Sequence, residues 1–332
     1  MVTFRLRAPE AKSVLLRASW AGGEIAMAKD AEGLWSVTVG PVEPDIYSYT
    51  FAVDGLHIVD PSNPQVKLWQ GGATSLVEVP AEEPTWYDWR EAPHGDLHVH
   101  YYESSVTPTP RRLFVYTPPG YEQKTDQSYA VLYLLHGSGD DESTWTTVGH
   151  ANLILDNLIA AGDAEPMIVV MTNGHPIPYG QRSPENRGQN TALFRQELTA
   201  DVMPYVAKRY RLRPDRESRA IAGLSMGGGQ ALNVGLGRPD LFAWVGAFSS
   251  GAPDTNDETL LKFLEDPAAA DLELLWIAVG EDDFLLDRNR AFRKALEEGG
   301  VEHVYQETPG DHSWPVWRRY LKEFAPLLFQ TP

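Results

Sequence analysis

The chain has 332 residues, carries a formal net charge of −18 and contains no cysteine. The charge disfavours acidic partners such as nucleic acid or an anionic membrane surface, and the lack of cysteine excludes disulfides, thiol catalysis and zinc–thiolate sites. With 42% hydrophobic residues and no long apolar run, the composition is that of a globular protein, and its length suggests about two domains.

The front of the chain alternates between apolar and polar side chains in short runs that Gly, Pro and Asp turns separate. Regular runs of this kind are typical of a β-sandwich. They cover Val2–Pro9, Lys12–Ser19, Leu34–Gly40, Asp45–Gly55 and Ser75–Pro80. The sequence therefore predicts a small all-β domain over residues 1–82.

Residues 83–95 are rich in Pro, acidic residues and Trp and show no periodicity, so we interpret them as a linker. The aromatic stretch 86–89 within it needs a surface on which to be buried. We therefore expect the front domain to pack on the rest of the chain and to contribute stability more than chemistry.

From residue 96 to residue 332 the pattern changes to apolar runs that alternate with helical stretches, which is typical of an α/β domain with a mostly parallel central sheet. Leu97–Ser104 and Arg111–Tyr121 are expected to form an antiparallel pair. The buried strands are expected at Tyr129–Gly137, Pro166–Gly174, Arg219–Gly223, Trp244–Gly251 and Leu272–Gly280. Helices are expected at Ala151–Ala161, Leu193–Tyr210, Gly227–Gly237, Phe284–Glu298 and Pro315–Phe329.

Three chemically reactive segments follow predicted strands. Gly223–Gly227 fits G-x-S-x-G, the motif that holds a serine on a tight turn between a strand and a helix. An acidic run, 281–283, ends a later strand, and 311–313 (Asp-His-Ser) follows the last predicted strand, His303–Gly310. Ligands bind at the carboxyl edge of such sheets, and the order serine, acid, histidine is that of α/β-hydrolases.

These three segments supply the side chains that acyl transfer through a serine requires. Ser225 is the candidate nucleophile, His312 the base that takes its proton, and Asp283 the carboxylate that orients the histidine. Asp282 remains a rival for the acid. Asp283 has a structural alternative as the N-cap of a helix that begins at Phe284, and His312 has one as a packing residue near two tryptophans.

An oxyanion formed at Ser225 needs preorganised N–H donors. We expect one from the backbone of Met226 and the second from Ser138, with Gly137 beside it, in the loop that follows an apolar strand. The walls of the substrate site are expected in the segment 173–190 and at large side chains near it. The candidates for contact with substrate are Trp145, Asn173, His175 and Trp314. No metal-binding or cofactor motif is present, and acyl transfer to water needs none.

Four stretches, HGSGDDESTW, GLSMGGGQAL, GEDDF and GDHSWPVWRRYLKEF, resemble carbohydrate esterase family one, the feruloyl and acetylxylan esterases. The resemblance covers about Asp96 to Phe329. It implies an α/β-hydrolase fold with the triad Ser225, Asp283 and His312 and the oxyanion donors Ser138 and Met226. The front of the chain resembles the early-set, immunoglobulin-like domain that many such enzymes carry, which is related to glycogen-binding modules.

The resemblance implies a serine carboxylesterase that removes feruloyl or acetyl groups from plant cell-wall polysaccharides through an acyl-enzyme. Its substrate would be a small acyl ester or an acylated oligosaccharide. Two alternatives stay open, namely a siderophore trilactone esterase and a non-catalytic glycan-binding protein. Such relatives are commonly secreted, so we expect a secreted or periplasmic protein whose leader is missing from this sequence, or a cytoplasmic protein if the sequence is complete.

Overall fold

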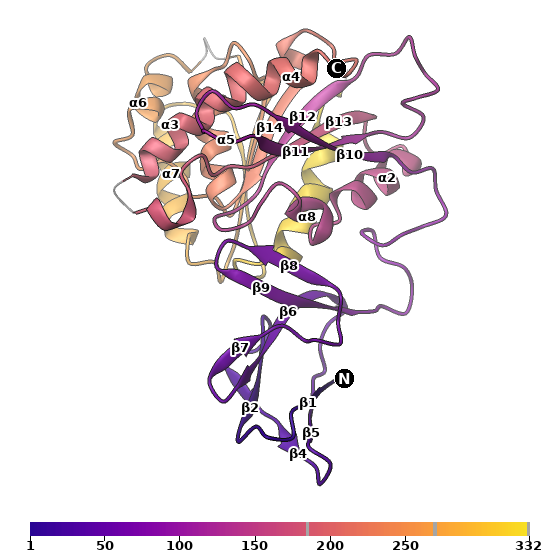
Figure 1. The fold of residues 1–332 in the computed structure, drawn as a ribbon. Coiled ribbons are helices and arrows are strands. Elements are labelled where there is room, and N and C mark those ends of the chain that lie inside the picture. The colour runs from indigo at the N-terminus through magenta and orange to yellow at the C-terminus, as the bar shows by residue number, and fades with distance from the viewer. Residues whose placement is uncertain (184–185, 268–270, 331–332) are drawn as a thin grey trace. The chain divides into compact units, whose positions relative to one another are not determined.

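A computed structural model describes residues 1–183, 186–267 and 271–330 of the chain (Figure 1). It divides the chain into two compact units, Met1–Thr85 and Trp86–Pro332. Most of the predicted linker, from residue 86 onward, therefore belongs to the second unit. No helix in the described parts of the chain combines the length and the apolar character needed to cross a membrane.

The first unit is a sandwich of two antiparallel sheets, as the alternating runs predict. One sheet has the order β1 (Val2–Arg7), β5 (Leu34–Val39), β4 (Ala28–Lys29). The other has the order β3 (Glu24–Ala26), β2 (Val14–Ala18), β6 (Asp45–Val53), β9 (Gly72–Val79), β8 (Val66–Trp69), and β7 (Leu56–Ile58) also pairs with β6. Their inner faces meet in a core that includes Phe4, Leu16, Trp35 and Phe51.

The second unit is built around one mixed sheet, which confirms the predicted fold class. Its strand order is β10 (Asp96–Tyr102), β11 (Arg111–Thr117), β13 (Met167–Thr172), β12 (Ala130–Leu135), β14 (Arg219–Leu224), β15 (Trp244–Phe248), β16 (Leu274–Gly280), β17 (Val304–Thr308). The pairs β10–β11 and β11–β13 are antiparallel, and every pair from β13 to β17 is parallel. The parallel strands therefore all end at one edge of the sheet.

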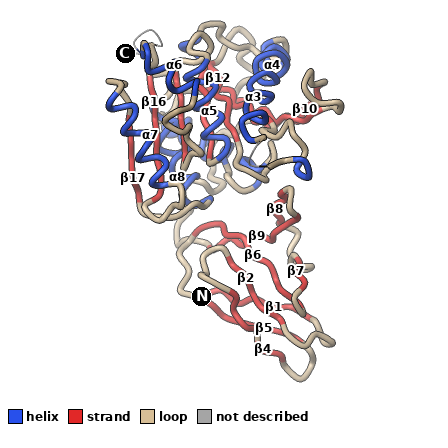
Figure 2. Tube along the Cα trace, turned by 90° about the vertical axis from the view of Figure 1, so that its left-hand side faces the viewer, coloured by secondary structure: helices blue, strands red, loops and turns tan. Residues whose placement is uncertain are grey.

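Helices cover both faces of this sheet (Figure 2). One apolar core joins the sheet to α3 (Arg187–Glu197), α5 (Met226–Gly237), α6 (Glu258–Glu265) and α7 (Leu286–Glu298). On the other side α2 (Ala151–Ala161) packs against α8 (Trp314–Phe324). The shorter pieces are α1 (Thr144–Thr147), α4 (Met203–Ala207) and the 3₁₀ turns Tyr179–Gln181, Arg216–Ser218 and Ala325–Leu327.

The helix expected at Leu193–Tyr210 differs from the observed one in its start and in its middle. α3 begins at Arg187. Its start was predicted too late because the first turns carry polar residues and show no apolar periodicity. A π-helical segment, Leu198–Val202, then joins α3 to α4.

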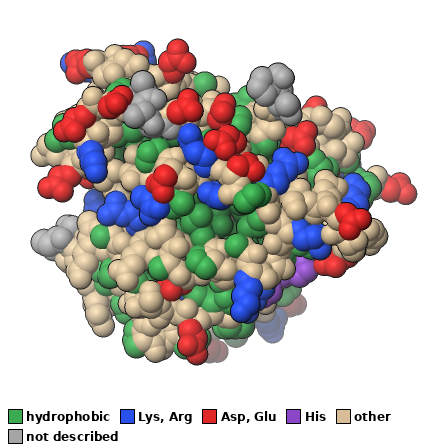
Figure 3. Space-filling view, turned by 90° about the horizontal axis from the view of Figure 1, so that it is seen from above, with side chains coloured by type: hydrophobic (Ala, Val, Ile, Leu, Met, Phe, Trp, Pro, Cys, Tyr) green, Lys and Arg blue, Asp and Glu red, His purple; other side chains and the backbone are tan. Residues whose placement is uncertain are grey.

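Figure 3 shows a face on which acidic and basic side chains are interspersed around a hydrophobic centre, so the acidic excess of the chain is not concentrated there.

The linker residues are anchored inside the second unit by Asp156 of α2. Its carboxylate, which is 1% exposed, accepts hydrogen bonds from the ring of His94 (2.8 Å), the N–H of Gly95 (2.9 Å) and the hydroxyl of Tyr116 (2.7 Å). Trp89 stacks on His94, with the ring centroids 3.6 Å apart.

Two aromatic residues of the linker, Trp86 and Tyr87, contact cationic side chains of this unit, whereas Trp89 is 68% exposed. Arg318 of α8 lies 5.3 Å from the centre of the Tyr87 ring, and Lys322 lies 5.3 Å from the centre of the Trp86 ring. Their burial therefore gives no support to the argument that placed them against the front domain, and the expected packing of the two domains stays a prediction.

Replacement of Asp156 by Ala is expected to destabilise the second unit by about 3 kcal/mol, because three buried donors would lose their shared acceptor. For a domain of this size the loss corresponds to a fall of roughly 6–12 °C in Tm, measured by scanning calorimetry. The exposed Asp163, just after the same helix, provides the control, and Asp163→Ala should shift Tm by about 1 °C or less. Equal shifts for the two variants would contradict the anchoring role.

Candidate active site

Ser225 lies on a strained turn between β14 and α5. Its backbone has φ 52° and ψ −115°, a region that L-residues rarely adopt, and such strain collects at functional sites. A Cβ atom on Gly223 would lie 2.6 Å from the carbonyl carbon of Gly227, and one on Gly227 would lie 2.5 Å from the carbonyl oxygen of His136. The two glycines of the motif are therefore required by close backbone contact, which explains the G-x-S-x-G pattern.

The turns after β16 and β17 bring an acid and a base to this serine. His312 lies with Nδ1 2.8 Å from Oδ2 of Asp283 and Nε2 2.9 Å from Oγ of Ser225. A carboxylate only accepts hydrogen bonds, so Nδ1 carries the proton and Nε2 accepts from the serine hydroxyl. The structure thus joins the three residues in one hydrogen-bonded chain.

The two neighbouring aspartates differ in burial. The carboxylate of Asp283 is inaccessible to solvent, whereas Asp282 is exposed. Burial alone would raise the pKa of Asp283, but hydrogen bonds from His312 and from the N–H of Leu285 outweigh it and hold this pKa below its usual value. Asp283 contacts the histidine and also accepts the N–H of Leu285. Because α7 begins at Leu286 with Leu285 at its N-cap, the alternative that Asp283 caps a helix beginning at Phe284 is wrong.

The loop after β12 lies next to the serine. A Cβ atom on Gly137 would lie 3.5 Å from Cβ of Ser225, and Met226 begins helix α5 directly after the serine. Within the described residues, the N–H groups of Ser138 and Met226 donate to no protein acceptor, whereas the N–H groups of Gly139 and Asp140 are bonded. Two backbone donors beside Ser225 are therefore available to a ligand.

Asn173 and His175, which we expected to contact substrate, are used in holding loops together. Asn173 donates through Nδ2 to Glu142 (2.8 Å), and its Oδ1 accepts the N–H of His175 (2.9 Å). His175 is 4% exposed, and Nε2 of its ring accepts the N–H of Gly139 at 3.0 Å. Burial, together with the nearby His136, Arg182 and Arg111, lowers the pKa of His175 to about 2.

Trp145 and Trp314 lie in the core and do not form an open wall. Trp145 is 1% exposed, and its indole N–H donates to the carbonyl of Leu135 at 2.9 Å. Trp314 is 8% exposed and packs edge-on against Trp145, with the ring centroids 5.2 Å apart. The prediction that these two side chains line the substrate site is wrong, because their rings fill space under the loops. Of the predicted segment 173–190, residues 184–185 lie outside the described residues.

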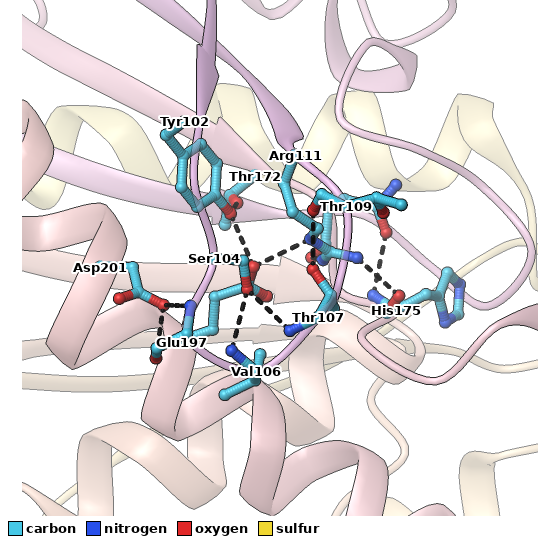
Figure 4. Close-up of polar contacts among 12 residues, drawn as sticks. Tyr102, Ser104, Val106, Thr107, Thr109, Arg111, Thr172, His175, Glu197 and Asp201 are labelled. Atoms are coloured by element: carbon cyan, nitrogen blue, oxygen red, sulfur yellow. Dashed lines mark hydrogen bonds and ion pairs between the residues drawn. The ribbon is translucent and has the colours of Figure 1, made fainter.

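A buried polar network behind these loops was not predicted. Arg111 of β11 forms an ion pair with Glu197 of α3 (2.9 Å) and donates to the carbonyl of His175 (2.8 Å), and Tyr102 donates to the same glutamate (3.0 Å) (Figure 4). These residues are far apart in the sequence and belong to no motif. His136 was also missed as a functional candidate, although its position directly after an apolar strand was a usable signal.

The arrangement offers a hydroxyl, a base that can take its proton, a carboxylate that holds the base and two free N–H groups. These are the parts that acyl transfer through a serine ester requires. Among the described residues, no group of three or more His, Asp or Glu side chains is arranged to hold a metal ion.

A family model described as "Putative esterase" matches residues 104–327. An endo-1,4-β-xylanase/feruloyl esterase of Xylanibacter ruminicola is 32% identical over 340 residues, which cover 98% of this chain. The chain spans only 44% of the length of that relative.

Solved structures agree in fold. A CE1 ferulic acid esterase from the anaerobic fungus Anaeromyces mucronatus is 27% identical with a TM-score of 0.65, and the match covers 74% of this chain and 96% of that one. An enterochelin esterase from Shigella flexneri is 21% identical with a TM-score of 0.72, and the match covers 99% of this chain and 92% of that one. At that identity the second likeness shows the fold alone.

The buried histidines predict a loss of stability in acid. An unfolded histidine titrates near 6.5, whereas His175 stays neutral in the folded chain, so below about pH 6 the unfolded chain binds a proton that the folded chain does not. This difference lowers the free energy of unfolding by about 1.4 kcal/mol for each pH unit as the pH falls.

His175→Gln should therefore reduce the dependence of the unfolding free energy on pH, between about pH 6 and pH 4, by roughly 1.4 kcal/mol per pH unit. Urea titrations at several pH values measure this slope. A slope equal to that of the parent would show that His175 is protonated in the folded chain.

Proposed function

This chain belongs to the esterase family whose model matches residues 104–327, and from that premise we propose that it is a serine carboxylesterase acting on feruloyl or acetyl esters of plant cell-wall polysaccharides. The observation that carries the proposal is the hydrogen-bonded chain from Ser225 through His312 to Asp283. A nucleophile, a base and an orienting carboxylate in this geometry support an acyl-enzyme mechanism.

In the proposed reaction, Ser225 Oγ attacks the ester carbonyl while its proton passes to His312 Nε2. Asp283 keeps the proton on Nδ1 and stabilises the imidazolium that forms. The N–H groups of Met226 and Ser138 bind the negative oxygen of the tetrahedral intermediate. His312 then gives the proton to the leaving alcohol, and a water molecule activated by the same histidine releases the acid.

The comparisons support the choice of substrate. The Xylanibacter relative is named a xylanase/feruloyl esterase, and the Anaeromyces enzyme has also been solved in complex with ferulic acid. In this chain Phe284 is 75% exposed, and its ring centroid lies 4.5 Å from that of His312. An exposed aromatic ring beside the base favours a substrate that carries an aromatic acyl group or a sugar ring.

A siderophore trilactone esterase is the less favoured candidate. The likeness to the enterochelin esterase rests on the fold, and a net charge of −18 would repel an anionic ferric siderophore.

The loops 137–150 and 174–190 are rich in polar residues, which favours a sugar ester over a long acyl chain.

Replacement of Ser225 by Ala is expected to lower kcat by about 10⁶, because the members of a triad act as a unit. Asp283→Asn should lower kcat by about 10⁴, because an amide would favour the wrong tautomer of the histidine. Asp282→Asn is the matched control and should stay within about threefold of the parent, since its side chain faces solvent. Hydrolysis of p-nitrophenyl acetate measures all three, and a larger loss for Asp282→Asn would move the acid to that residue.

The substrate proposal predicts a higher kcat/KM for methyl ferulate and acetylated xylo-oligosaccharides than for p-nitrophenyl palmitate. Phe284→Ala should raise KM for methyl ferulate by about tenfold and leave p-nitrophenyl acetate nearly unchanged, because only methyl ferulate carries an aromatic acyl group. Maximal activity on long acyl chains, or on a catecholate trilactone with no turnover of either cell-wall ester, would reject this substrate class.

A further inference from the structure

Two buried histidines link the loops that follow β12 and β13. His136, directly after β12, accepts the N–H of Gly174 through Nε2 at 2.9 Å. His175, three residues after β13, accepts the N–H of Gly139 through Nε2 at 3.0 Å. Each histidine therefore bonds the backbone of the loop that carries the other, and the two rings lie 5.3 Å apart.

Both bonds require neutral rings with the proton on Nδ1. Nδ1 of His136 donates to the carbonyl of Gly137 at 2.8 Å, which leaves Nε2 as its acceptor. A neutral imidazole has one acceptor nitrogen, so the bond from Gly139 places the proton of His175 on Nδ1 as well. Arg182 Nη1 lies 2.6 Å from Nδ1 and 3.1 Å from Nε2 of His175. A guanidinium only donates, so with the proton on Nδ1 its hydrogen bond is the one to Nε2, the acceptor that it shares with Gly139. The charge of Arg182 also disfavours protonation of the ring.

The linked loops lie beside the nucleophile and the residue that follows it. Gly137 lies beside Ser225, while a Cβ atom on Gly174 would lie 3.0 Å from the side chain of Met226. The carbonyl of Gly174 also accepts a hydrogen bond from Gln230 of α5 at 2.9 Å. The loop after β12, the loop after β13 and the helix after Ser225 are therefore fixed to one another through Gly174 and the two rings.

We propose that His136 and His175 are positioning residues, which hold the loop 137–139 so that the N–H of Ser138 faces the oxyanion formed at Ser225. This inference rests on the proposed function. The bond to Gly139 fixes the residue directly after Ser138, and the ring of His136 bonds the carbonyl of the residue before it. With both flanking peptides tied, the N–H of Ser138 keeps one direction before substrate arrives, as an oxyanion donor must.

An ordinary structural role would not require this pattern. A histidine whose only role is to fill the core needs a single hydrogen-bond partner. Here each ring instead accepts a backbone N–H from the other loop. The carbonyl of His175 is itself held by Arg111, whose partner Glu197 lies on α3. The linked loops are thus connected to a buried ion pair that restricts their movement, and the expected consequence is a specific loss of transition-state binding when one link is removed.

The test compares His175→Phe, which removes the acceptor but keeps a ring, with His175→Gln, whose amide oxygen can still accept a hydrogen bond. With p-nitrophenyl acetate as substrate, His175→Phe should lower kcat by about 10- to 100-fold with KM within about threefold. This loss is smaller than the 10²–10³ that follows removal of an oxyanion donor. His175→Gln should stay within about threefold in kcat.

Inhibition by phenylboronic acid separates positioning from general damage, because its tetrahedral adduct with the serine places an oxygen where the oxyanion would lie. Its inhibition constant should rise by the same factor as kcat/KM falls. His94→Phe, which disturbs a histidine bonded to Asp156 in the same unit, should change neither quantity by more than about twofold. If His175→Phe does not fold, His175→Asn, whose shorter amide cannot reach Gly139, is measured in its place.

A folded His175→Phe variant with unchanged kcat/KM would overturn the inference, as would a fall in kcat without a matching change in boronate inhibition. Ser225→Ala, assayed beside it, tests the proposed function separately. Activity retained in Ser225→Ala would reject the serine mechanism whatever His175→Phe does. Activity lost in Ser225→Ala but kept in His175→Phe would reject the positioning role alone.

Discussion

The close approach of backbones around Ser225 is the constraint on which the site depends. A left-handed residue at this turn costs roughly 1–3 kcal/mol, and the surrounding structure must hold it in place. The N–H of Ser225 donates to the carbonyl of Phe248 on β15 at 2.8 Å, and its own carbonyl accepts the N–H groups of Gly229 and Gly251 at 3.1 and 2.8 Å. The strained residue is thus bonded on both sides, so its backbone is fixed while its hydroxyl is bonded to His312.

The carboxylates near the site are buried and paired with arginines. Loops that approach a nucleophile so closely leave little room for water, and an unpaired buried charge would be costly. Arg111 therefore meets Glu197, and Glu142 receives Arg112 and Asn173. Neutral histidines accept the N–H groups of Gly139 and Gly174 and add no charge to this region.

Local patterns in the sequence were sufficient where a residue's role follows from its place at a strand end. Ser225 and Asp283 follow apolar runs, His312 follows the last predicted strand, and the parallel sheet brings such ends together. Burial was harder to predict. Trp145 has the same sequence context whether it lines a pocket or fills the core, and its partner, the carbonyl of Leu135, is visible only in three dimensions. The pair of Arg111 and Glu197 was missed because neither residue has a local signal. The short strands β3, β4, β7 and β8 were also missed, because a strand of two to four residues carries too little periodicity.

The two sides of the sheet hold the site in different ways. On the side of β15 to β17, the acid and the base occupy turns whose positions follow from neighbouring parallel strands, and backbone bonds such as that from Glu281 to Thr308 support them. On the side of β11 to β13, the loops are held by side chains that reach across from distant positions, as His136, His175 and Arg111 do. Backbone support depends little on side-chain identity, whereas side-chain support fails when one partner changes. Substitutions outside the triad are therefore expected to affect catalysis most on the side of β11 to β13, where the loop with Ser138 lies.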